Sequence, residues 1–101
     1  MIRLIVGQFI NKEELIAILE DPRTDAVELN FIAIDQSLSE DIIRRYKSIL
    51  PWNLISKYQE MSEEFMMEFI NNINYRSLKN NNRISKEVKD PVLNLLRLRK
   101  F

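Results

Sequence analysis

Cysteine and histidine are both absent from the 101 residues of this chain. Without cysteine the chain has no disulfide, no thiolate nucleophile and no Cys-ligated zinc. Without histidine it lacks the commonest general base and the commonest protein ligand of transition metals. We therefore expect a non-enzymatic protein that has no catalytic residue, no metal site and no cofactor.

Glycine occurs once, at Gly7, which excludes a glycine-rich phosphate loop or dinucleotide fingerprint and disfavours a fold rich in β-hairpins. The chain also lacks an apolar run of about 18 residues, so we expect no membrane span. Residues 1–7 are too short and too weakly apolar for a signal peptide. These features predict one cytoplasmic domain that covers residues 1–101.

Three polar residues stand where helices are expected to begin. Asn11, Ser39 and Ser62 are good N-cap residues, and each is followed by acidic residues that the helix dipole favours in the first turn. Apolar residues at helical spacing then continue the pattern. After Ser39 this pattern predicts a helix as far as Leu50, where Pro51 ends it and begins a short helix that carries an aromatic stripe.

The same pattern returns at a constant interval of about 23 residues, which indicates a tandem repeat. Ser39 corresponds to Ser62, and a further step of equal length reaches Ser85. Trp52 corresponds to Tyr75, and residues 21–25 form an additional loop. We therefore predict an all-α fold, a short stack of five to seven helices in repeats at about 10–37, 38–60, 61–83 and 84–101.

Two parts of the chain leave room for other structures. Alternating apolar residues at 2–6 and 26–34 favour an α+β alternative with two short N-terminal strands. Near the other end, Pro91 is expected to break the chain, with Asp90 capping a last helix over 91–100. That helix would turn Leu93, Leu96 and Val92 towards the core.

Residues 52–66 carry a motif within this repeat. The matching residues are Trp52, Ile55, Ser56, Gln59, Ser62, Glu63 and Phe65, with Met61 and Met66 as conservative departures. This stretch resembles the W-x-x-I-S-x-x-Q-x-L-S-E-x-F-I repeat of uncharacterised tandem helical-repeat proteins from large DNA viruses and bacteriophages. The match is partial at 29–43 and fades after Tyr75. The resemblance implies stacked helical units and a viral or phage source, and it implies no activity.

Charge is divided unevenly along a chain whose net charge is zero. Residues 1–70 hold seven Lys/Arg and thirteen Asp/Glu, whereas residues 71–101 hold eight and two. The basic third is a candidate for binding nucleic acid, since cations contact phosphates. The favoured interpretation is that the oppositely charged ends attract one another within the fold or form solvated faces. A third interpretation is that they join head to tail between copies. The candidate nucleic-acid-binding residues are Arg76, Lys79, Arg83, Lys86, Arg97, Arg99 and Lys100.

Trp52, Tyr58, Phe65 and Phe69 form the densest aromatic group. Packing between adjacent helices is the favoured interpretation, and partial exposure would instead make the group an anchor for a partner. The leading functional hypothesis is a phage- or virus-encoded protein–protein interaction module of the host cytoplasm, with a host-takeover or anti-defence inhibitor as its specific form. The alternatives are a nucleic-acid-binding protein and a self-assembling structural component.

Overall fold

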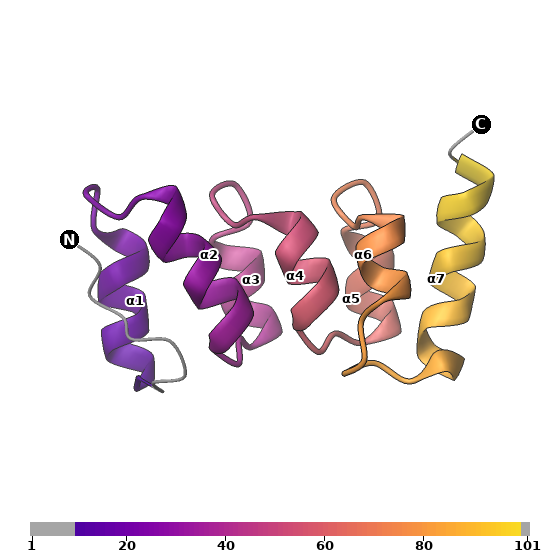
Figure 1. Ribbon diagram of the computed structural model, residues 1–101, viewed down its shortest axis with the longest axis horizontal. Coiled ribbons are helices and arrows are strands. Elements are labelled where there is room, and N and C mark those ends of the chain that lie inside the picture. The colour runs from indigo at the N-terminus through magenta and orange to yellow at the C-terminus, as the bar shows by residue number, and fades with distance from the viewer. Residues whose placement is uncertain (1–9, 100–101) are drawn as a thin grey trace. The chain divides into compact units, whose positions relative to one another are not determined.

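The computed structural model describes residues 10–99, which form seven helices and no strand (Figure 1). The predicted all-α fold is confirmed for this range. No helix among these residues is long and apolar enough to cross a membrane. The helices are α1 (Lys12–Glu20), α2 (Ala26–Asp35), α3 (Glu40–Arg45), α4 (Trp52–Tyr58), α5 (Glu63–Glu68), α6 (Tyr75–Lys79) and α7 (Lys86–Arg99).

The three predicted N-caps are confirmed by their hydrogen bonds. The hydroxyl oxygens of Ser39 and Ser62 each accept a bond of 3.2 Å from the backbone amide three residues later. Asn11 and Glu14 form a reciprocal capping box, with bonds of 2.8 and 3.3 Å. Each cap satisfies an amide that has no partner inside its helix.

The backbone beyond the caps at Ser39 and Ser62 also repeats at the same interval. The amides of Tyr46 and Phe69 each donate to the carbonyl four residues earlier at 3.1 Å, and both residues then leave helical geometry. The helix predicted from Ser39 to Leu50 is therefore too long, because α3 ends at Arg45. The chain then turns over 46–49, and the same turn follows α5 over 69–72, where Asn74 stands at the place of Pro51.

Residues 26–34 are helical, so the strand of the α+β alternative is wrong at this place. Asp25 caps α2 by accepting a hydrogen bond from the Glu28 amide at 2.9 Å. Glu28, Ile32 and Ala33 are buried at helical spacing. The sequence alternates there only in part, and the cap and one buried face favour the helix. The other expected strand, at 2–6, lies outside the described residues.

The predicted break at Pro91 is also wrong, because α7 continues from Lys86 to Arg99 with Pro91 inside it. The helix begins after Ser85, whose carbonyl accepts from the Lys89 amide at 3.0 Å, and Asp90 is an interior residue. A proline inside a helix costs about 3 kcal/mol. Burial of Val92 and packing against α5 and α6 offset this cost. Leu93 and Leu96 are half-buried, as expected of a core-facing side.

The chain divides into two compact units, residues 1–51 and 52–101, called here the N-terminal and C-terminal units. In the N-terminal unit the end of α1 is joined to the end of α3. One carboxylate oxygen of Glu20 accepts hydrogen bonds from Arg45 Nη2 at 2.9 Å and from the Tyr46 hydroxyl at 2.6 Å. Burial raises the pKa of the Tyr46 hydroxyl above its ordinary value, and the bond to Glu20 raises it further.

In the C-terminal unit, α4 packs on α6, and α7 packs on both α5 and α6. The buried side chains include Ile55, Phe65, Met66, Leu78 and Val92. All four helices of this unit therefore contribute side chains to its core.

We predict that replacing Tyr46 with Phe lowers the free energy of unfolding at pH 7 by about 1 kcal/mol, through loss of the bond to Glu20. The raised pKa keeps Tyr46 protonated in the folded chain above about pH 10, where an unfolded tyrosine loses its proton. Wild-type stability should thus fall as pH rises through this range, and the variant should lack this part of the fall. Urea titrations at pH 7 to 11 test this, with Tyr58→Phe as control. If the free energy of unfolding fell equally steeply with pH above about pH 10 in wild type and in Tyr46→Phe, the prediction would be contradicted.

Candidate binding surface

The aromatic group is largely a packing cluster within the C-terminal unit. The rings of Trp52 and Phe69 stack with centroids 5.4 Å apart, and Phe65 lies 4.7 Å from Phe69. Only 1% of Phe65 and 6% of Phe69 is exposed, so these two residues do not serve as surface anchors. Trp52 and Tyr58 are half-buried and keep some accessible surface.

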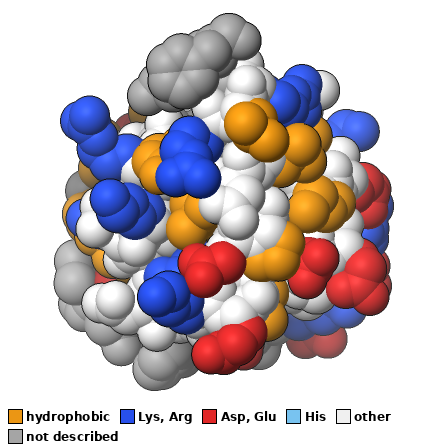
Figure 2. Space-filling model, turned by 90° about the vertical axis from the view of Figure 1, so that its right-hand side faces the viewer, with side chains coloured by type: hydrophobic (Ala, Val, Ile, Leu, Met, Phe, Trp, Pro, Cys, Tyr) orange, Lys and Arg blue, Asp and Glu red, His pale blue; other side chains and the backbone are white. Residues whose placement is uncertain are grey.

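Five of the predicted basic residues form an exposed group that we call the basic surface. Arg76 and Lys79 lie one turn apart on α6, Arg83 lies in the following loop, and Lys86 and Arg97 lie three turns apart on α7. Figure 2 shows Lys and Arg side chains along the left and the top of this face, with acidic side chains lower down and on the right. The five cations therefore lie on two helices that pack on each other and on the loop between them.

The basic surface is not neutralised by contact with carboxylates. Within residues 10–99, none of its five cations forms an ion pair with Asp or Glu. Arginines of the N-terminal unit do so at 2.9 to 3.1 Å, as in Arg45 with Glu20 and Arg44 with Asp41. Arg97 contacts only the neutral amide of Asn94 at 3.3 Å. Lys100, the last predicted basic residue, lies outside the described residues.

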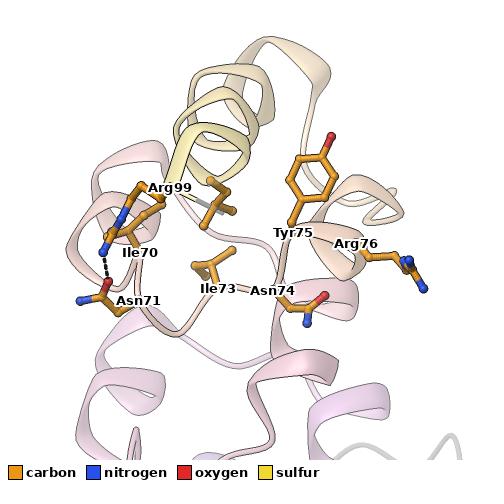
Figure 3. Close-up of a pocket in the computed structure, with 8 residues that line it drawn as sticks. Ile70, Asn71, Ile73, Asn74, Tyr75, Arg76 and Arg99 are labelled. Atoms are coloured by element: carbon orange, nitrogen blue, oxygen red, sulfur yellow. Dashed lines mark hydrogen bonds between the residues drawn. The ribbon is translucent and has the colours of Figure 1, made fainter. Parts of the chain in front are cut away.

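A cleft of about 500 Å³ adjoins this surface (Figure 3). Residues 70–76, from the end of the α5 turn to the start of α6, form most of its lining. Leu96 and Arg99, from the last turns of α7, supply the rest. Arg99 lies on one side, where it donates a hydrogen bond to Asn71, and Tyr75 and Arg76 lie on the other side. The lining residues are Ile70, Asn71, Ile73, Asn74, Tyr75, Arg76, Leu96 and Arg99.

The loop that lines the cleft is held to α4 by Ser56. The hydroxyl oxygen of Ser56 accepts a hydrogen bond from the Asn74 amide at 3.1 Å. Asn74 in turn caps α6, where its side-chain oxygen accepts from the Ser77 amide at 2.9 Å. Ile73 is buried beside them. The cleft therefore has a wall whose backbone is fixed by the interior of the unit.

Asn81 is the structural residue of this region that the sequence did not reveal. Residues 80–82 form a loop after α6, and within this loop Asn81 is fully buried. Its side-chain amide donates to the carbonyls of Ser56 and Gln59, at 2.8 Å each. Its side-chain oxygen accepts from the Arg83 amide at 2.8 Å. Nothing in a run of three asparagines marks the middle one, because the two carbonyls that it binds belong to α4 and the turn after it, far away in the sequence.

Lys89 extends this network to α7. Its ammonium donates to the backbone carbonyl of Asn81 at 2.7 Å and also lies 3.4 Å from that of Lys79. One basic residue of the C-terminal third is thus used for structure, by joining α7 to the end of α6. The cations of the basic surface remain exposed beside it.

The side chains at this surface provide binding chemistry. Among residues 10–99 no group of three or more His, Cys, Asp or Glu is placed to hold a metal ion. The cleft offers guanidinium groups, side-chain amides and aliphatic carbons. Such groups bind acceptor atoms and apolar side chains.

No protein-family model, no curated protein and no solved structure matches this chain. The viral or phage source that the motif at residues 52–66 implies therefore stays a prediction. Function is inferred from the geometry and charge of the described residues.

We predict that Asn81→Ala lowers the free energy of unfolding by about 2–3 kcal/mol, since two buried carbonyls lose their donor. Asn81→Asp keeps nearly the same side-chain shape. It should lower the free energy of unfolding at least as much, because a carboxylate donates no hydrogen bond to those carbonyls. The exposed neighbour provides the control, and Asn82→Ala should stay within about 0.5 kcal/mol of wild type. Chemical denaturation measures all three. If both Asn81 variants were as stable as the Asn82→Ala control, the network would be dispensable.

Proposed function

We propose that this chain is a non-enzymatic protein–protein interaction module, and that it contacts an acidic partner through the basic surface. The observation that carries the proposal is that five exposed cations of α6, α7 and the loop between them have no carboxylate partner among residues 10–99. Exposed cations of this kind attract acidic surfaces and orient them before contact.

A protein partner is favoured by the apolar groups beside the cations. Leu98 is 72% exposed near the end of α7, and the adjoining cleft is floored by isoleucine and leucine. Protein interfaces combine apolar anchors with a charged rim, and buried anchors contribute most of their affinity. The likeness of residues 52–66 to a viral and phage motif supports a host protein as partner. Inhibition of a host function is the specific form of this proposal.

Reversing two charges of the basic surface tests the proposal. We expect Lys79→Glu with Lys86→Glu to lower capture of the partner from a host lysate by about tenfold, because attraction becomes repulsion. Both lysines are exposed, and their side chains form no hydrogen bond or ion pair within residues 10–99, so the fold should survive. Circular dichroism would verify this, and quantitative mass spectrometry of the retained proteins provides the measurement.

The matched control makes the same change of charge on the N-terminal unit. Lys12 and Lys47 are exposed there, and Lys12→Glu with Lys47→Glu should retain wild-type capture. Equal losses in both double variants would mean that net charge alone drives retention. Failure of the wild type to enrich any protein would reject the proposed function.

Binding of single-stranded nucleic acid is the second candidate, because Tyr75 stands beside Arg76 in the cleft. An aromatic ring next to a cation suits a stacked base and its phosphate. This alternative predicts binding of a fluorescent oligonucleotide that weakens steeply with salt, together with loss of binding in the Lys79/Lys86 double variant. Anisotropy titration at several salt concentrations measures it. An oligonucleotide that does not bind at low salt would eliminate this candidate.

A further inference from the structure

We propose that the cleft between residues 70–76 and the last turns of α7 binds a short acidic peptide segment that carries one aliphatic side chain. The inference rests on the proposed function and adds to it the chemistry of the partner. The cleft volume of about 500 Å³ lies within the usual range for a ligand site and exceeds that of a single side chain.

The hydrogen-bonding capacity that remains in the cleft consists largely of donors. The side-chain oxygen of Asn74 already accepts from the Ser77 amide, and that of Asn71 accepts from Arg99. Each of these asparagines therefore presents an NH2 group that has no partner among the described residues. Such groups, together with two guanidinium groups, match the carbonyl and carboxylate oxygens of an acidic peptide.

Charge in the cleft has one sign. Arg76 and Arg99 lie on opposite sides with their guanidinium groups outermost, and none of the described lining residues is Asp or Glu. A cationic peptide would place its charges against these arginines, and a neutral one would leave them without counterions. Acidic residues on both sides of the bound segment satisfy both arginines, which gives the site its selectivity.

The floor between the arginines is aliphatic. Ile70, Ile73 and Leu96 line it, and Figure 3 shows Ile73 between Arg99 and Arg76. Branched aliphatic carbons suit a Leu, Ile or Val side chain, which gains free energy in proportion to the apolar area that it buries. A nucleic acid would gain more from flat aromatic surfaces, and among the described residues that line the cleft only Tyr75 is aromatic. The floor therefore favours a peptide.

The walls are ordered before any ligand arrives. Ile73 donates its amide to the Phe69 carbonyl at 3.1 Å, and the Asn74 amide is held by Ser56. Arg99 is oriented by its bond to Asn71. A site with these features loses little conformational entropy when it binds, so a short peptide can reach measurable affinity.

Fluorescence anisotropy with short labelled peptides tests this proposal on the full chain. The probes have the form Asp-Glu-Xaa-Asp-Glu, in which Xaa is Leu, Ile, Val or Ser, and a charge-reversed probe replaces every acidic residue with Lys. We expect the three aliphatic peptides to bind at least about tenfold more tightly than the Ser peptide, because the Ser side chain leaves the floor uncovered. The lysine peptide should not bind.

Two matched double variants locate the site. Arg76→Gln with Arg99→Gln removes the two charges of the cleft and should weaken the Leu peptide by about tenfold or more. Lys86→Gln with Arg97→Gln removes two charges of the basic surface that do not line the cleft, and should change affinity about twofold at most. Nuclear magnetic resonance should place the shifted amides at 70–76 and 96–99.

The outcomes separate this proposal from the proposed function. If no acidic peptide binds, or if both double variants weaken binding equally, the cleft is not the peptide site. Lysate capture that still depends on Lys79 and Lys86 would then leave the proposed function standing. An oligothymidine that binds more tightly than every peptide, and loses affinity in Arg76→Gln with Arg99→Gln, would overturn the peptide assignment in favour of nucleic acid.

Discussion

The buried carboxamide of Asn81 is the contact on which the C-terminal unit depends. The last carbonyls of any helix lack partners within it, and those of Ser56 and Gln59 at the end of α4 receive both hydrogens of the Asn81 side chain. Ser56 also accepts the Asn74 amide through its hydroxyl. The loops before and after α6 are therefore both held to Ser56, a residue of the repeat motif. A helix of five residues is too short to be stable alone. The hydrogen bonds to Ser56 hold α6 at both ends, and so fix the backbone that carries Arg76 and Lys79.

Local signals explain what the sequence predicted well. A cap residue acts through an amide three residues away, so Asn11, Ser39 and Ser62 marked the starts of α1, α3 and α5 correctly. The errors arose where distant packing outweighs local preference. Pro91 disfavours a helix locally, yet α7 contains it because Val92 and the residues around it pack on two other helices. The length of α3 was overestimated because Leu50 is buried through a turn, a placement that helical spacing alone does not distinguish from a helix.

The candidate site was predictable only in part for the same reason. The excess of cations after residue 70 is visible in the composition, and the structure leaves six of the described ones exposed, five on the basic surface and Arg99 in the cleft. The cleft was not foreseen, because Ile73 and Leu96 are far apart in the chain and meet only when α7 packs. Asn81 was missed because the repeat places Asn82, one residue later, at the position of Gln59. The register of the repeat therefore identifies the element but misplaces the residue by one.

Pro91 connects the repeat to the candidate site. α3 ends at Arg45 and α5 at Glu68, and the next residue at the interval of the repeat is Pro91. Tyr46, Phe69 and Val92 then correspond, and all three are buried. The first two leave the helix at this point, whereas α7 continues to Arg99. This continuation includes Leu96, which corresponds to Ile73, and Arg99. The cleft is therefore formed where the last repeat, 84–101, departs from the pattern of the two repeats before it: a helix that stopped at Pro91 would leave Ile73 uncovered and would supply no second arginine.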